Sequence, residues 1–395
     1  MEQPTSRDVD VAVVGLGGIG SAAAYWVARR AGIRLAGFEQ FELGHANGAS
    51  HDHSRIIRLS YHRPDYVRLA RRAYATWADV EAEADEPIVT RIGGLDLFPP
   101  GAAIAEADYT ASMGAEDVAF ERLDGREVMR RWPQWRLDDG TVALFQAETG
   151  IADPSRGNGV HQRLAVAHGA RLHPGTAVDR LSDTGSGVVL KLRNGGSLVA
   201  GRVIVTADAW TNDLLAPLDL RLPLTVTQEQ VTYFDVADPS AFAPDRFPVW
   251  IWMDDPSFYG FPTYGLPGPK AGQDVGGPEV TPATRTFEPH PPATARLRTF
   301  VERHLPGLAV PPLLTKTCLY TLTPDRDFVV DRLPDHPDIV VVLGAAHGYK
   351  FASVLGRIAA ELACDGSTPS AGELEAFRID RPVLRQPDPP GRFLV

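Results

Sequence analysis

The segment Val11-Ala-Val-Val-Gly-Leu-Gly-Gly-Ile-Gly20 joins a short apolar run to a glycine-rich turn. A run of small and apolar residues with helical spacing follows from Ser21. A second apolar run, 34–38, then ends at Glu39. This order of strand, turn, helix, strand and acid is typical of a dinucleotide-binding fold.

Each part of that segment has a physical task. Gly15 permits the tight turn, Gly17 lets the backbone approach a pyrophosphate, and Gly20 lets the helix pack closely on the strand. The start of the helix offers unpaired N–H groups and a partial positive charge to phosphates. Glu39 stands where a carboxylate accepts hydrogen bonds from a ribose diol. A glycine-rich turn without a ligand is the alternative, but the coincidence of these features favours a bound dinucleotide.

The composition is that of an ordinary globular protein, because 44% of its 395 residues are hydrophobic and 23% are charged. This length predicts two domains. The net charge of −11 argues against nucleic acid or an anionic membrane as a partner. There is no signal-like segment and no long apolar span, so we expect a soluble, cytoplasmic protein, and we expect a monomer. Cys318 and Cys364 have no metal-type spacing, and no metal site is expected.

Hydrophobic periodicity and turn signals predict further elements along the chain. Helices are expected at 64–84, 153–169, 293–304 and 350–364, and strands within 178–205 and 222–264 and at 315–321, 328–331 and 339–343. The stretch 267–292 is rich in proline and glycine and is expected to be a loop. Strand-rich sections therefore interrupt a nucleotide-binding fold that is completed near the C-terminus. We predict an α/β (α+β) chain of two interleaved domains, with a ligand crevice between them.

A set of motifs extends over nearly the whole chain. They are the glycine turn with Glu39, residues 45–58, Tyr259-Gly-Phe-Pro262, Lys270, Cys318-Leu-Tyr-Thr321 and residues 344–351. In order and spacing they resemble the monomeric sarcosine oxidase / N-methyltryptophan oxidase family. The resemblance implies a flavoenzyme of glutathione-reductase-like fold whose FAD is joined through the flavin 8α carbon to a cysteine. It also implies oxidation of an amino acid's secondary amine to an imine, which water hydrolyses, while O2 is reduced to hydrogen peroxide.

The resemblance also implies where the two domains lie. A Rossmann-like FAD-binding domain is expected at 1–90, 150–215 and 320–395, and an antiparallel-sheet substrate domain at 91–149 and 216–319. The expected cofactor-binding residues are Gly15, Gly17, Gly18, Ile19, Gly20, Glu39, Gln40, Asn47, Ser50, His51, Ser54, Arg55, Val178, Cys318, His347, Gly348, Tyr349 and Lys350.

Cys318 corresponds to the flavin attachment site of the family, and a thiolate is a good nucleophile for such a bond. Without the resemblance, Cys318 would be interpreted as a small buried hydrophobe, as Cys364 still is. His51 and Arg55 resemble the pair beside the flavin ring, where a cation stabilises the negative charge of the reduced ring. The alternative is a loop histidine and an arginine paired to a carboxylate. We assign no role to His53.

Three expected roles concern the reaction itself. Lys270 resembles the lysine near flavin N5 that promotes reaction with oxygen, although a lone lysine in such a loop would otherwise be solvated surface. Arg58 and Lys350 resemble the pair that holds the substrate carboxylate; alternatively, Arg58 contacts flavin phosphate and Lys350 is exposed. Tyr259 and Tyr320 resemble the pocket walls, and Tyr320 is included among the catalytic residues with Lys270, His51 and Arg55.

Departures from the family pattern put sarcosine itself in doubt as the substrate. Asp274 stands where family members with the smallest substrates have a histidine; it could pair with a substrate amine or face solvent. The stretch 62–64 is shorter than in the family and lacks its pocket glutamate. Trp250 and Trp252 could line a larger pocket, although paired strand tryptophans are more often core.

Rival functions remain at this stage. A flavin dehydrogenase with an acceptor other than O2 is opposed by Lys270. A non-catalytic dinucleotide-binding protein and an NAD-dependent dehydrogenase are the others, and Cys318 with the His51/Arg55 loop opposes the latter.

Overall fold

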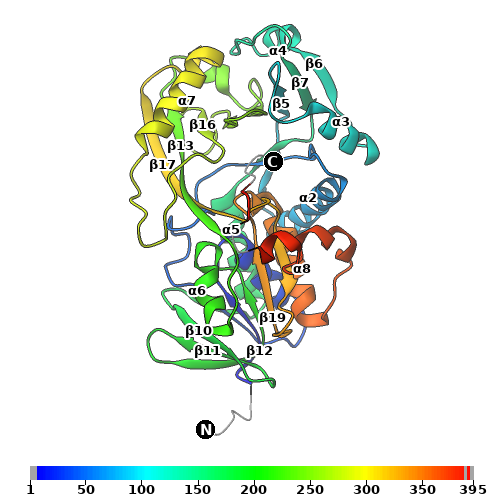
Figure 1. Ribbon diagram of the computed structural model, residues 1–395, viewed down its shortest axis with the longest axis vertical. Helices are drawn as coiled ribbons and strands as arrows, with labels where there is room; N and C mark the ends of the chain where they lie inside the picture. The colour runs from blue at the N-terminus through cyan, green and yellow to red at the C-terminus, as the bar shows by residue number, and fades with distance from the viewer. Residues whose placement is uncertain (1–6, 387–388, 392–395) are drawn as a thin grey trace.

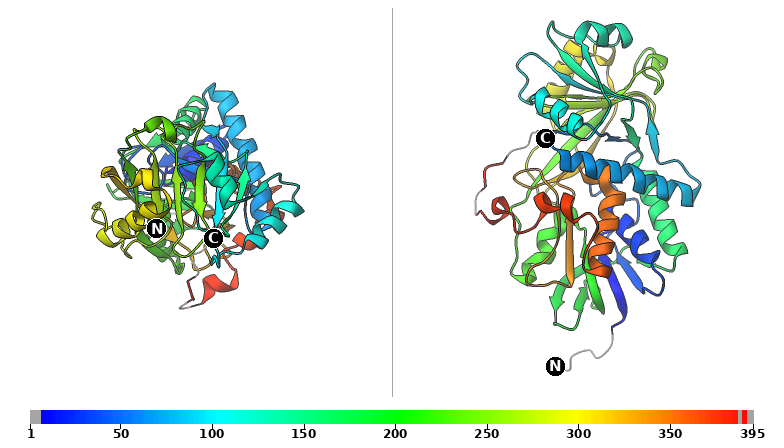
Figure 2. Two further views of the ribbon diagram at one scale, coloured as in Figure 1. Left: turned by 90° about the horizontal axis from the view of Figure 1, so that it is seen from above. Right: turned by 90° about the vertical axis from the view of Figure 1, so that its right-hand side faces the viewer.

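The strands form two large sheets and one small one in the computed structural model, which describes residues 7–386 and 389–391. Figure 1 shows the strands of one large sheet in the lower half of an elongated molecule and those of the other in the upper half. The long helix α2 lies across the middle (Figure 2, right). Within the described residues, no helix is both long and apolar enough to cross a membrane.

Sheet 1 has the order β10-β11-β12-β1-β2-β9, with β19 paired to β12 and β18 paired to β19. Its strands are β1 (Val9–Val14), β2 (Leu35–Phe38), β9 (Arg171–His173), β10 (Val178–Asp183), β11 (Val188–Leu192), β12 (Ser197–Val205), β18 (Val329–Arg332) and β19 (Ile339–Leu343). The central strands are parallel, so Val14, Phe38 and Val205 lie side by side where their strands end. This edge is where parallel sheets bind ligands.

Helix α1 (Gly18–Ala28) is buried at every residue except Ile19. It packs between α8 (Ala352–Asp365) and α5 (Pro154–Ala167), so it needs an apolar surface on all sides. The approach to α8 is close, because a Cβ added to Gly356 would lie 2.5 Å from Ala22 Cβ. The small residues after Ser21 therefore serve helix packing.

Sheet 2 has the order β17-β13-β16-β15-β14-β5-β7-β6. Its strands are β5 (Gly94–Phe98), β6 (Glu121–Asp124), β7 (Val142–Gln146), β13 (Thr225–Phe234), β14 (Val249–Trp252), β15 (Phe258–Phe261), β16 (Lys270–Gln273) and β17 (Pro312–Leu322). Only β5 and β14 pair in parallel. The small sheet, sheet 3, has the order β3-β8-β4, formed by β3 (Arg55–Ile57), β8 (Gly150–Ala152) and β4 (Val89–Arg91).

The remaining helices are α2 (Pro64–Ala84), α3 (Glu106–Ala115), α4 (Gly125–Arg131), α6 (Thr211–Leu215) and α7 (Pro291–His304). The expected α/β (α+β) class is confirmed, as are the helix at 64–84 and the strand at 339–343. The strands of sheet 1 come from 9–205 and 329–343, and those of sheet 2 from 94–146 and 225–322. The exact domain boundaries stay a prediction.

Two local expectations were wrong. The stretch 267–292 is not only a loop, because it contains β16, whose four residues are all buried between β13 and β15. Lys-Ala-Gly-Gln is a poor strand sequence, and pairing on both sides overrides its propensity. The last helix begins at Ala352 after a 3₁₀ turn, Gly348–Phe351, rather than at 350.

The tryptophans of β14 do not enlarge a pocket. Successive strand residues face opposite sides of a sheet, and Ile251 takes the pocket side. Trp250 and Trp252 are therefore buried on the other side, where both contact the ring of Phe300 on α7.

Candidate active site

A long pocket runs from the carboxyl ends of β1, β2 and β19 to one face of sheet 2. Val14, Phe38 and Leu343 line it at the first end, and Tyr259 and Phe261 line it at the second. Strands of both large sheets therefore line this pocket, and its place between two domains stays a prediction.

The glycine turn forms the floor of the first end. Gly15 adopts a positive φ of 93°, which favours glycine. A Cβ on Gly20 would overlap the Gly15 carbonyl oxygen, so the helix can start this close to β1 only with glycine there. The Gly18 N–H donates to Ser50 Oγ at 2.9 Å. Gly15, Gly17 and Gly18 thus line the pocket at a helix N-terminus without side chains, which allows a pyrophosphate to approach closely.

Glu39 follows β2 and lines the same end of the pocket. Its carboxylate accepts hydrogen bonds from the amides of Leu16 at 2.9 Å and Phe41 at 3.1 Å, and it lies 3.3 Å from His45 Nε2. Burial opposes ionisation of Glu39, but the hydrogen bonds from His45 and Leu16 outweigh it and lower its pKa. The carboxylate is thus held ionised, as a ribose diol requires.

Most of the expected cofactor-binding residues line this one pocket. They are Gly15, Gly17, Gly18, Ile19, Glu39, Gln40, Ser50, Arg55, Val178, His347, Gly348, Tyr349 and Lys350. Gly20, Asn47, His51, Ser54 and Cys318 are not among the lining residues. Gly20 acts through packing, and Asn47 O accepts a hydrogen bond from Arg285 at 2.6 Å.

Arg55 is the cation of the loop before β3. Its guanidinium donates to the carbonyl oxygens of Ala49 (2.7 Å), His51 (2.9 Å) and Ser54 (2.9 Å), and it forms no ion pair with a described residue. His51 is neutral, because burial and the charge of Arg55 lower its pKa to about 4. Its Nε2 lies 3.1 Å from the Thr317 carbonyl oxygen. Of the expected pair, only Arg55 carries charge.

Cys318 lies on β17, two residues before Tyr320. Residues two apart share a face of a strand, and Tyr320 lines the pocket, so the Cys318 thiol points to the pocket side of sheet 2. Burial raises the pKa of this thiol to about 12, while Arg55 acts in the opposite direction. Cys364 is near the end of α8, where it packs against the apolar core.

The second end of the pocket carries paired charges. Arg58 Nη1 lies 2.7 Å from Asp96 Oδ1, and both side chains are buried. Asp96 also accepts a hydrogen bond from the Ser60 hydroxyl. Asp96 therefore compensates the charge of Arg58, which the sequence motif alone did not indicate. Asp96 lies 38 residues away on another sheet, and no local pattern marked it.

Lys350 differs from Arg58. Its Nζ has no carboxylate within ion-pair distance among the residues that the structure describes. Burial, followed by the charge of Arg58, lowers its pKa to about 7. Because the side chain lines the pocket, its ammonium is available to an anionic ligand.

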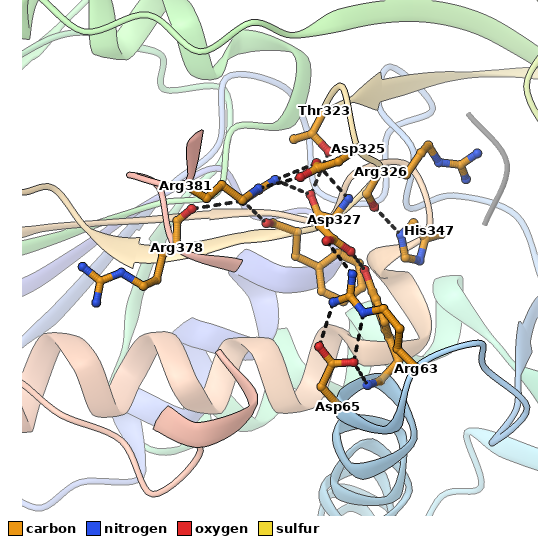
Figure 3. A network of polar contacts seen from close by, with 11 residues as sticks. Arg63, Asp65, Thr323, Asp325, Arg326, Asp327, His347, Arg378 and Arg381 are labelled. Carbon is orange, nitrogen blue, oxygen red and sulfur yellow. Dashed lines mark hydrogen bonds and ion pairs between the residues drawn. The ribbon is translucent and has the colours of Figure 1, made fainter. Parts of the chain in front are cut away.

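Asp274 also lines the pocket, and Arg326 Nη1 lies 3.1 Å from its Oδ2. Arg326 has a positive φ of 62° in the turn between β17 and β18. Figure 3 shows how this turn is fixed: Arg381 pairs with Asp325, Arg63 pairs with Asp327, and His347 contacts the Arg326 carbonyl oxygen. Asp274 thus faces the pocket with a rigid cationic partner, which sequence reasoning missed.

Lys270 is not solvated surface. Its side chain is 2% exposed, and its Nζ lies 2.8 Å from Asp52 Oδ2 and 3.2 Å from the Ser54 carbonyl oxygen. It is paired across the strands with Phe261, which lines the pocket, so Lys270 projects from the same face of sheet 2. Sequence reasoning missed Asp52, which lies 218 residues away.

Comparisons with known proteins agree with this geometry. A profile of the family described as FAD dependent oxidoreductase matches residues 10–362. This chain belongs to that family. It is 32% identical to a monomeric sarcosine oxidase from Bacillus sp. (strain B-0618), covering 96% of this chain and 98% of that one. It is also 32% identical to an N-methyl-L-tryptophan oxidase from Salmonella arizonae, covering 94% and 98%.

A solved structure of NikD, an unusual amino acid oxidase essential for nikkomycin biosynthesis, has the same fold. It is 27% identical, with a TM-score of 0.83 over 94% of this chain and 98% of that one. The chain is thus a flavin-dependent oxidoreductase of the amine oxidase kind, and the NAD-dependent rival is excluded. The glycine turn, Glu39 and the lining of this flavoprotein's pocket fit FAD.

Proposed function

We propose that this flavoprotein oxidises N-methyl or other secondary α-amino acids to imines and reduces O2 to hydrogen peroxide. The observation that carries the proposal is the continuity of one pocket from the glycine turn to Lys350, Tyr259 and Tyr320. The names of the similar oxidases point to the same class of substrate. We also expect a monomer that works in the cytoplasm.

The substrate carboxylate is expected to bind Lys350, with Arg58 as the second cation. The Lys350 ammonium supplies the net positive charge, because Asp96 compensates Arg58 and Asp274 lies beside Arg326. These cations also disfavour a substrate ammonium. They therefore select the neutral amine, whose nitrogen lone pair assists loss of hydride from the adjacent carbon. Bound FAD supplies the hydride acceptor.

Asp274 is the candidate partner for the substrate amine or for a polar substrate side chain. The ion pair with Arg326 fixes its position, and 25% of its side chain is exposed. Tyr259 and Tyr320 line the same pocket, close enough for the charge of Asp274 to act on both hydroxyls.

Covalent attachment of FAD to Cys318 is part of the proposal. The thiol must ionise before it can attack, and its high pKa opposes this step. Arg55 supplies positive charge from the pocket wall. The same cation would stabilise negative charge on the bound flavin ring. Attachment would replace one 8α C–H bond and the S–H bond by a C–S bond, with the two electrons and two protons passing to O2 as hydrogen peroxide.

A flavin dehydrogenase remains the second candidate for a specific reason. Lys270 is not among the lining residues, and its ammonium donates to Asp52. The two candidates differ in the fate of the electrons. An oxidase forms one hydrogen peroxide for each amine oxidised, whereas a dehydrogenase turns over in air only when an artificial acceptor is added.

The test is anaerobic bleaching of the flavin by a panel of N-methyl, cyclic and glycated amino acids, with their decarboxylated amines as matched controls. The proposal requires that at least one of these amino acids bleaches the flavin and that its decarboxylated amine is a poor substrate. Bleaching by the amines alone would contradict it.

A further inference from the structure

Asp52 is the centre of a buried charge cluster beside the pocket. Its carboxylate lies 2.8 Å from Lys270 Nζ and 3.0 Å from Lys316 Nζ. The Tyr233 hydroxyl donates to both of its oxygens, at 2.7 and 2.8 Å. The Asp52 and Lys270 side chains are each 2% exposed, whereas that of Lys316 is 28% exposed.

The backbone holds this carboxylate in an unusual position. Asp52 has a positive φ of 79°, which is unfavourable for a residue with a Cβ. Its carbonyl oxygen accepts hydrogen bonds from the Ser155 amide at 3.2 Å and the Ser155 hydroxyl at 2.7 Å. The start of α5 therefore fixes the backbone of Asp52, and three strands of sheet 2 supply the partners of its carboxylate.

The cluster is not neutral. Two ammonium groups share one carboxylate, and Arg55 is close enough to act on both Asp52 and Lys270. Burial lowers the pKa of Lys270 to about 8; Asp52 opposes the shift, and Arg55 and Lys316 increase it. Tyr233 stays a neutral donor because burial and Asp52 raise its pKa. Neutral His51 and the Cys318 thiol are the other titratable groups nearby.

We propose that Asp52 is a positioning residue that keeps the Lys270 ammonium charged and oriented. Lys316 binds the same carboxylate, and its positive charge opposes this effect of Asp52. The balance between Asp52 and Lys316 sets the pH range over which O2 is reduced. This inference rests on the proposed oxidase function, with Lys270 in the role that the family resemblance implies for it in the oxygen reaction.

The physical basis is the charge that oxygen acquires. Reduction of O2 to hydrogen peroxide takes two electrons and two protons, and the first electron makes a bare anion. A fixed ammonium stabilises that anion, whereas a neutral amine does not. Lys270 Nζ lies 4.5 Å from the centre of the ring of Phe261, a residue that lines the pocket. Its charge therefore acts on the pocket over a short distance.

Removing each partner should move the Lys270 pKa in a different direction. Asp52→Asn is close in shape and removes the anion, so the pKa should fall by about one to three units. Lys316→Met removes a like charge, so the pKa should rise. A purely structural role would not produce opposite shifts.

The chain suits a direct measurement because its only lysines are Lys191, Lys270, Lys316 and Lys350. NMR titration of the holoenzyme labelled with ¹³C at lysine Cε should resolve four signals, and single methionine substitutions assign them. The pH midpoint of flavin reoxidation, measured by mixing reduced enzyme with O2, should follow the same order. Lys191→Met, at an exposed position of β11, is the matched control and should shift neither quantity.

Shifts of the same sign, or none, in Asp52→Asn and Lys316→Met would overturn the inference. If Asp52→Asn fails to fold, the upward shift in the half-exposed Lys316 variant still decides it. Lys270→Met separates the two claims. If Lys270→Met reoxidises slowly but the pH midpoints of Asp52→Asn and Lys316→Met are unchanged, this inference alone is wrong. If Lys270→Met reoxidises at the normal rate, the role of Lys270 in the oxygen reaction is wrong as well.

Discussion

The two ends of the pocket are built in different ways. At the dinucleotide end, one stretch from β1 to Glu39 supplies the glycine turn, the helix N-terminus and the carboxylate. At the other end, three functional side chains are paired with residues far away in the sequence: Arg58 with Asp96, Lys270 with Asp52 and Asp274 with Arg326. The first end depends on backbone shape, and the second on compensated charge. Substitutions at the two ends should therefore fail in different ways.

The largest effect is expected at the dinucleotide end. Gly20→Ala places a Cβ against the Gly15 carbonyl oxygen and should abolish FAD binding, with most of the protein misfolded. Flavin content and thermal unfolding measure this. Gly114→Ala in α3 is the control, because nothing lies within 4 Å of its added Cβ. Its free energy of unfolding should rise by up to about 1 kcal/mol. A Gly20 variant with normal flavin content would contradict the close packing described here.

This contrast also explains what the sequence could predict. The glycine turn, α1 and β2 form a local pattern, so their structure and ligand class could be read from spacing. Asp52, Asp96 and Arg326 carry no local signal, because their roles depend on which distant residue each one faces. Lys270 was located by its motif, but its burial and its partner were not predictable. The strand that carries it forms only by pairing with neighbours.

Cys318→Ser should convert retained flavin into released flavin. Wild-type protein should keep its yellow colour in the pellet after acid precipitation, and the variant should lose it to the supernatant. Cys364→Ser is the matched control and should retain the flavin, since that thiol packs at the end of α8. Release of flavin from the wild-type protein would remove the covalent bond from the account.

Lys270→Met should slow reoxidation by air by about a hundred- to a thousandfold, the cost of losing one charge that stabilises an anionic transition state. Anaerobic reduction by substrate should be comparatively unaffected, because Lys270 is not among the residues that line the pocket. Stopped-flow absorbance separates the two half-reactions. Equal slowing of both would indicate general disruption of the fold.

Lys350→Met and Arg58→Ala should each weaken binding of an acid substrate at least about thirtyfold. They should differ in stability, because removal of Arg58 leaves buried Asp96 without its ion-pair partner. Arg58→Ala should therefore lower the midpoint of thermal unfolding, and Lys350→Met should not. Unchanged affinity in both variants would require another orientation of the substrate.

The smallest effect concerns pH. The pKa of Lys350 is lowered to about 7, so its ammonium is present below that pH and is lost above it. An inhibitor with a carboxylate but no amine should bind more weakly as pH rises through 7, by at most about tenfold per unit. A titration of flavin absorbance measures this. The dependence should disappear in Lys350→Met, and its persistence there would assign it to another group.

The most direct test of the account is a single-turnover product balance. The oxidised enzyme is mixed without air with one equivalent of the best N-methyl amino acid, and O2 is then admitted. The account predicts that the flavin bleaches fully, that its colour returns in air, and that one hydrogen peroxide forms for each amine consumed. Flavin that stays oxidised with every acid offered, or bleached flavin that air does not reoxidise, would contradict it.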